Sequence, residues 1–163
     1  MKTRYVSLWI FIVFLFLLTS CVSAEVRLNK KFETLPEVES ILLYESSSIY
    51  SGATGRCKGT FMDRWYGTEQ DAETISKLYS DAFSEKGWTI WPEDVVEIWS
   101  VESDNGLYRA GLDVFAEPTS VSQEQASYRL PDSVFREFSH YRTVYLISMT
   151  YRSSSVAKRC FGK

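Results

Sequence analysis

The chain has 163 residues, of which 45% are hydrophobic, which is enough for one domain with a buried core. Its formal net charge of −3 excludes the strongly basic surface that nucleic-acid binding usually requires. No cofactor motif is present, so we expect no cofactor.

The first residues have the three-part layout of a secretory signal. Lys2 and Arg4 precede an apolar run at residues 8–18, and small residues follow it. The run has eleven residues, whereas a membrane-spanning helix needs about 20. We expect residues 1–20 to be a signal peptide and the chain to be exported.

The segment Leu18-Thr19-Ser20-Cys21 resembles the lipobox of bacterial lipoproteins. The resemblance implies that Cys21 receives a diacylglyceryl group and becomes the first mature residue, with membrane lipid as its partner. Two acyl chains hold a protein at a bilayer, whereas one binds only marginally. Val22 replaces the aspartate associated with inner-membrane retention, which favours the periplasmic side of the outer membrane in a host with two membranes. The alternative is ordinary cleavage after Ala24, which removes Cys21.

The next segment, residues 21–34, is polar and charged and predicts a lipidated N-terminus with a tether. Residues 35–163 then form a single domain. Its two cysteines, Cys57 and Cys160, predict a disulfide, because exported compartments are oxidising. A zinc site is the alternative for this pair. With Cys21 set aside as a candidate lipid attachment site, one histidine and two cysteines are too few for a common four-ligand zinc site, so we expect no metal.

Two strand-like segments open the domain, at residues 40–50 and 58–68, with turn-rich residues between them. A helix over about 69–86 follows, with apolar residues at helical spacing on one face. Thr68 and Asp71 resemble a capping box at its start. Gly87 predicts its end, where Trp88 folds back on the last turn.

Residues 94–117 predict two strands joined at Asn105-Gly106, the pattern of a type I′ turn. In the second of these strands the even-numbered residues 108–114 share a face that should be buried. A polar insert follows, and Pro131-Asp132 opens a short helix over about 132–140. The last strand, residues 143–151, alternates apolar residues and should be buried on one side.

This order predicts an α+β fold in two layers: an antiparallel sheet of about five strands, the main helix on one face, and the short second helix. Part of the chain also resembles a small module that recurs in bacterial lipoproteins and secreted proteins. The resemblance covers residues 35–91, lacks the usual Pro-Gly-Ala-like opening, and implies no particular activity. It is carried by Leu35-Pro36, Tyr66, Thr68, Asp71, Tyr79 and Gly87-Trp88.

No known catalytic motif is present, so we predict no catalytic residues and no enzyme. The alternative is an envelope hydrolase acting on peptidoglycan or lipid, with His140 and a carboxylate such as Asp113. Neighbouring acidic residues at 93–94 and 102–104 flank predicted turns, where such residues are common for backbone reasons.

Aromatic residues are frequent, at 15% of the chain. Four of them define a possible binding surface for a sugar ring or an apolar segment of a partner; filling the core is the alternative. They are Trp65, Tyr66, Trp91 and Trp99. The sequence thus predicts a membrane-tethered, non-enzymatic module of the cell envelope that binds a protein or glycan partner and no nucleic acid.

Overall fold

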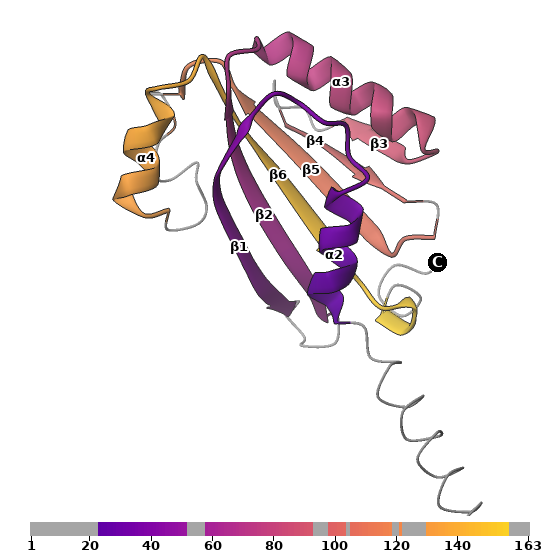
Figure 1. Ribbon diagram of the computed structural model, residues 1–163. Coiled ribbons are helices and arrows are strands. Elements are labelled where there is room, and N and C mark those ends of the chain that lie inside the picture. Colours follow the sequence, from indigo (N-terminus) through magenta and orange to yellow (C-terminus); the bar gives the residue numbers. More distant parts are fainter. Residues whose placement is uncertain are drawn as a thin grey trace, which may run out of the picture.

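The computed structural model describes residues 23–51, 58–92, 98–103, 105–118, 121 and 130–156. They form an antiparallel sheet of six strands in the order β1-β2-β6-β5-β4-β3, with helices packed against it (Figure 1). The elements are α2 (Ala24–Phe32), β1 (Ile41–Ser51), β2 (Lys58–Thr68), α3 (Ala72–Glu85), β3 (Thr89–Pro92), β4 (Ile98–Glu102), β5 (Tyr108–Phe115), α4 (Asp132–Phe138) and β6 (Thr143–Tyr151). The predicted α+β class with an antiparallel sheet is confirmed.

The last strand of the chain, β6, lies in the middle of the sheet, between β2 and β5. Its residues facing α2 and α3 include Tyr145 and Ile147, which are buried as expected. The opposite side of β6 is buried as well, because Val144 and Leu146 pack against α4. The prediction of a strand buried on one side was therefore incomplete: a central strand between two covered faces needs apolar residues on both.

The helices cover both faces of the sheet. Helices α2 and α3 pack on one face, and α4 packs on the other at the β1 side (Figure 1). The expected two-layer arrangement is thus correct for α3 and incomplete for α4. Each face has its own core: Ile75, Phe83 and Leu112 belong to the first, and Val134 and Phe138 to the second.

Helix α3 confirms the main helix and corrects its first turn. Asp71, and not Thr68, is the N-cap: its carboxylate accepts a 2.8 Å hydrogen bond from the Thr74 amide. The Thr68 hydroxyl instead donates to the Glu39 carbonyl, at 2.8 Å. At the other end Gly87 has φ 70°, and the Trp88 amide donates to the Phe83 carbonyl, which is a Schellman motif.

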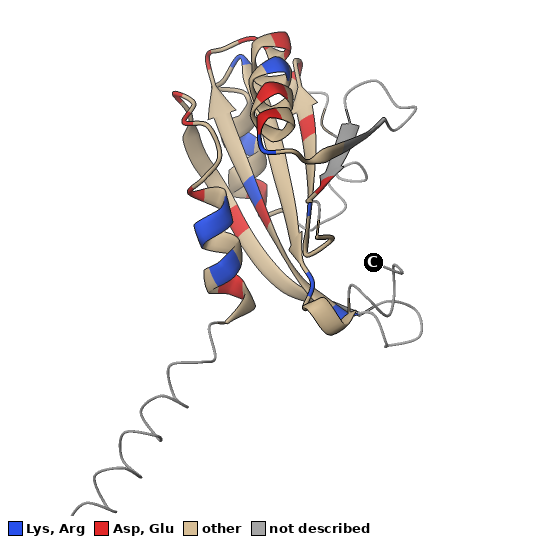
Figure 2. Cartoon of the chain, turned by 90° about the vertical axis from the view of Figure 1, so that its right-hand side faces the viewer, with Lys and Arg blue, Asp and Glu red and all other residues tan. Residues whose placement is uncertain are grey.

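Helix α2 occupies the segment that the sequence predicts to be a tether. Ser23 caps its start, and the helix places Leu28 and Phe32 in the core of the first face. Its basic side chains lie over rings of the sheet: the Arg27 guanidinium is 5.6 Å from the Tyr151 ring centroid. Figure 2 shows basic residues along α2 and acidic ones along α3. The tether prediction is wrong for residues 24–32, and the folded body begins before residue 35.

The hairpin between β4 and β5 is present, but its turn differs from the prediction. The Ser103 amide donates the last backbone hydrogen bond to the Tyr108 carbonyl at 3.1 Å, and the Tyr108 amide donates to Ser103 Oγ, so four residues separate this pair where a type I′ turn has two. Gly106 supplies positive φ, at 64°. Strand β3 was not predicted, and it raises the expected five strands to six by pairing with β4.

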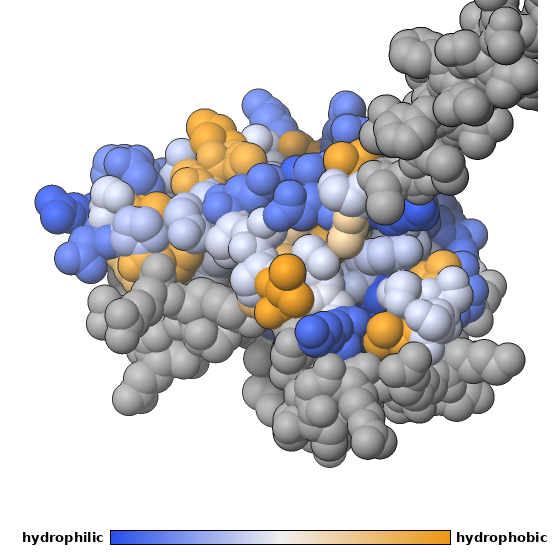
Figure 3. All heavy atoms as spheres, turned by 90° about the horizontal axis from the view of Figure 1, so that it is seen from below, coloured by the Kyte–Doolittle hydropathy of each residue, from blue (hydrophilic) through white to orange (hydrophobic). Residues whose placement is uncertain are grey.

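Large apolar side chains are exposed at only a few described positions. They are Val26 on α2 and Ile41, Leu42 and Ile49 on the edge strand β1. Seen from below, the apolar residues drawn in Figure 3 form separate patches between polar ones. Within the described residues, no helix has both the length and the apolar character needed to cross a membrane.

Candidate functional site

Three of the seven predicted site residues lie outside what the structure describes. Cys21, Cys57 and Cys160 are all outside the described residues, so lipidation and the disulfide stay predictions. Trp91 lies on β3 opposite Ser100, and Trp99 lies on β4 opposite Leu112. Only the backbone of these two tryptophans is described, so their part in a binding surface also stays a prediction.

Trp65 and Tyr66 are neighbours on β2 and therefore point to opposite faces of the sheet. The Trp65 side chain is 1% exposed and stacks on Phe138 of α4 with ring centroids 5.3 Å apart. It is a core residue and cannot belong to an exposed binding surface. Tyr66 is half-buried on the other face, beside a hollow in the surface.

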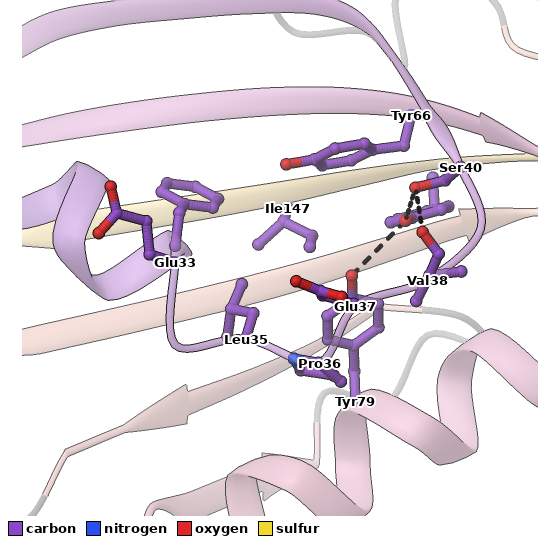
Figure 4. A pocket seen from close by; sticks show the side chains of 11 residues that line it. Glu33, Leu35, Pro36, Glu37, Val38, Ser40, Tyr66, Tyr79 and Ile147 are labelled. Carbon is purple, nitrogen blue, oxygen red and sulfur yellow. Dashed lines mark hydrogen bonds between the residues drawn. The ribbon is translucent and has the colours of Figure 1, made fainter.

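This hollow has a volume of about 490 Å³, within the range of about 300–1,000 Å³ typical of ligand sites. We call it the tyrosine pocket. Its walls come from the end of α2, the following loop, β2, α3 and β6 (Figure 4). The residues that line it are Phe32, Glu33, Leu35, Pro36, Glu37, Val38, Ser40, Tyr66, Tyr79, Tyr145 and Ile147.

Three tyrosines from three elements meet in the tyrosine pocket. Tyr66 and Tyr145 are paired across β2 and β6, and their rings stack with centroids 5.0 Å apart. Tyr79 comes from α3, and its ring centroid lies 5.8 Å from that of Tyr145. In Figure 4 the Tyr66 ring lies across the pocket from Leu35, and Tyr79 directs its hydroxyl towards the sheet.

The hydroxyls of the tyrosine pocket form a chain of hydrogen bonds with one direction. Ser40 Oγ donates to the Val38 carbonyl at 3.2 Å, and the Tyr145 hydroxyl donates to Ser40 Oγ at 3.0 Å. The proton of Tyr145 is thus already used, so in the 3.5 Å contact between the two tyrosine hydroxyls Tyr79 is the donor. Because a hydroxyl has one proton and two lone pairs, Tyr79 Oη keeps only the capacity to accept.

Burial keeps these tyrosines neutral. It raises the pKa of Tyr79 well above its usual range, and the neighbouring Tyr145 adds to this effect. Burial likewise raises the pKa of Tyr145 and of Tyr66, with the Arg64 charge lowering the latter in part. None of the three hydroxyls is therefore prepared to act as a base near neutral pH.

The charged side chains that line the tyrosine pocket are both acidic. Glu33 and Glu37 are exposed at its mouth, and no lysine, arginine or histidine is among the lining residues. Nearby cations are engaged elsewhere. The Arg64 guanidinium pairs with Glu45 at 2.5 Å, and the Lys86 ammonium donates to the Thr34 carbonyl. The mouth of the pocket is therefore negative.

The residues of the hydrolase alternative are placed apart from this pocket. His140 follows α4 with 67% of its side chain exposed and lies 3.8 Å from Glu137 of its own helix. Asp113 lies on another element, β5, opposite Ile98 and Leu146. Among the described residues, no group of three or more His, Cys, Asp or Glu could hold a metal ion.

Sequence reasoning found Tyr66 but missed the rest of the tyrosine pocket. The sequence predicts Tyr79 as an apolar position of a helix and as a residue of the module that the chain resembles. It predicts Tyr145 as an apolar position of a strand, and Ser40 carries no signal. The clue that was available is the phenol itself, because a buried tyrosine hydroxyl usually needs a hydrogen-bond partner. No family model, no curated protein and no solved structure gives a significant match to this chain.

Proposed function

We propose that this protein is a membrane-tethered, non-enzymatic binding module of the bacterial cell envelope, and that the tyrosine pocket is its ligand site. The tether is supported by the sequence, through the signal-like residues 1–20 and the lipobox-like segment that ends at Cys21. The binding role is supported by the pocket. The resemblance of residues 35–91 to a lipoprotein module of unassigned activity is part of the same proposal.

The observation that carries the binding role is a hollow in which apolar walls surround a few ordered polar groups. Leu35, Val38 and Ile147 supply apolar surface, while the hydroxyl chain from Tyr79 to Ser40 supplies fixed polarity. Ligand sites in proteins commonly have this composition. A binding role without catalysis agrees with the Tyr79 and Tyr145 hydroxyls, which donate inside the protein and are held neutral by burial.

Ligand-observed NMR with small aromatic fragments tests the binding role. The set includes fragments with cationic, neutral and anionic heads, and the mature protein is compared with two variants. Leu35→Trp fills the mouth of the pocket, whereas Val26→Trp adds the same ring on exposed surface of α2. We expect fragments that bind the wild type to lose binding to Leu35→Trp and to keep it with Val26→Trp.

Two results contradict the binding role. One is that no fragment of any charge binds the wild-type protein. The other is that the fragments bind Leu35→Trp as well as they bind Val26→Trp, since the site would then lie elsewhere. Thermal unfolding of each variant shows that the comparison is made between folded proteins.

A further inference from the structure

We propose that the tyrosine pocket binds the protonated amine of an organic ligand that has a flat or apolar body. The inference rests on the proposed binding role and adds the chemical class of the ligand. It follows from three features that meet in one place: an oxygen that can only accept hydrogen bonds, two carboxylates at the mouth, and aromatic walls.

The first feature is the direction of the hydrogen-bond chain. The chain ends at the Val38 carbonyl, and each hydroxyl from there back to Tyr79 uses its proton inside the protein. Tyr79 is 3% exposed and lines the pocket, so its oxygen offers a lone pair in a nearly dry environment. A ligand that meets it must bring an N–H or O–H donor, since an acceptor there would face a lone pair.

The second feature is the unbalanced charge of the lining. Figure 4 shows Glu37 between Leu35 and Tyr79, with its carboxylate turned towards the centre of the pocket. Glu33 stands at the rim, where α2 ends. Arg64, whose charge acts on the Tyr66 hydroxyl, and Lys86 are each bonded to another group and do not line the pocket, so the lining itself carries only the two carboxylates. A positively charged donor therefore fits better than a neutral one, and an anion is repelled.

The third feature selects the rest of the ligand. The Tyr66 ring lies across the pocket from Leu35, and Ile147 forms the floor between them (Figure 4). A flat or apolar group can stack on the ring and lose contact with water there. An amine with N–H donors matches the Tyr79 oxygen, whereas a quaternary ammonium has no proton to give. These features together specify a protonated amine with at least one N–H on an apolar body.

Three probes with the same body and different heads test the inference. They are 2-phenylethylamine, which is a cation near neutral pH, 2-phenylethanol, which is a neutral donor, and phenylacetate, which is an anion. Titration of each into the mature protein, followed by NMR, gives the affinities. We expect the amine to bind roughly tenfold more tightly than the alcohol and the anion to bind least. Added salt should lower the affinity of the amine and leave the affinity of the alcohol unchanged.

A pair of charge-removing variants locates the effect. Glu37→Gln removes the carboxylate that faces the pocket, and Glu39→Gln removes an exposed carboxylate two residues further on, which does not line it. We expect Glu37→Gln to lower the affinity for the amine roughly fivefold and to leave the affinity for the alcohol unchanged. Glu39→Gln should leave both affinities close to those of the wild type. Both positions are on the surface, so both variants should fold.

The outcomes separate this inference from the binding role on which it rests. Equal affinities for the amine and the alcohol, or equal effects of Glu37→Gln and Glu39→Gln, overturn the amine inference while the pocket remains a ligand site. Failure of all three probes to bind, or binding that Leu35→Trp does not reduce, overturns the binding role and the amine inference together. Preference for the amine that depends on Glu37 supports both.

Discussion

Asp63 on β2 is a carboxyl group that the fold buries without a hydrogen bond. It is 1% exposed, and neither of its oxygens has a hydrogen-bond partner in the described part of the chain. Serines face it on both neighbouring strands, Ser46 on β1 and Ser148 on β6. Burial raises the pKa of Asp63.

Because the pKa of Asp63 is raised in the folded protein, the free energy of unfolding should depend on pH in a known direction. The folded protein holds the Asp63 proton to higher pH than the unfolded chain does, so the free energy of unfolding falls as pH rises through the window between the two pKa values. Asp63→Asn removes the charge at nearly constant size. We expect it to be more stable than the wild type near neutral pH, by an amount of the order of 1 kcal/mol. Below the usual pKa of aspartate the two proteins should differ less.

Denaturant unfolding at a series of pH values from about 4 to about 7 measures this effect. Asp81→Asn is the matched control, because it removes an exposed aspartate of α3. Its pH dependence should follow the wild type. Parallel curves for Asp63→Asn and Asp81→Asn would show that burial of Asp63 does not affect stability.

Gly67 on β2 is subject to a steric constraint. The Tyr141 ring lies directly over Gly67 and occupies the space of a Cβ atom. Gly67→Ala should therefore destabilise the protein by about 1–3 kcal/mol. In a Tyr141→Ala background the same change should cost much less, since the ring is gone. A double-mutant cycle of unfolding free energies measures this coupling; independent, additive effects would contradict it.

At the scale of elements, sequence patterns predicted those helices whose formation depends on interactions within the segment itself. Helix α3 was found because its apolar spacing and Gly87 act within the segment itself, and its cap was placed three residues early because Thr68 has the right chemistry and a different partner. Helix α2 was missed because Leu28 and Phe32 are almost its only buried residues. Their contact with the sheet depends on residues far along the chain, which no local pattern contains.

Helix α2 should therefore contribute to stability as a packed element. Leu28 is 0% exposed, and Leu28→Ala should lower the free energy of unfolding by about 2–5 kcal/mol. Val26 is 44% exposed on the same helix, and Val26→Ala should change it by less than about 0.5 kcal/mol. Chemical denaturation of the mature protein makes the comparison. Equal stability of the two variants would restore the tether that the sequence predicts.

At the scale of the whole molecule, the candidate site could be predicted only in part. Alternation along β2 is enough to place Trp65 and Tyr66 on opposite faces. Which face holds a hollow depends on the strand order, since β6 must lie beside β2 before Tyr145 can stack on Tyr66. Tyr79 and Ser40 join them through packing of α3 and a loop. Such contacts join residues that are far apart in the sequence. They follow from the fold, and no local sequence pattern predicts them.

The proposed anchor is also a property of the whole molecule, and its test is the intact mass of protein isolated from membranes. We expect a chain that begins at Cys21 and carries a diacylglyceryl group. We also expect the mass to be lower by two hydrogens, from a disulfide between Cys57 and Cys160. Protein recovered without lipid and starting at Glu25 would contradict the anchor, and a mass change on alkylation without reduction would contradict the disulfide.

With the proposed anchor at Cys21, the early start of α2 would limit how far the domain can lie from the membrane. On the proposed anchor, only Val22 separates the acylated Cys21 from the helix cap at Ser23, and two residue steps of extended chain span about 7 Å. Because Leu28 is buried between α2 and the sheet, no long flexible linker would separate the proposed anchor from the folded domain. Whatever it binds must arrive at the bilayer surface.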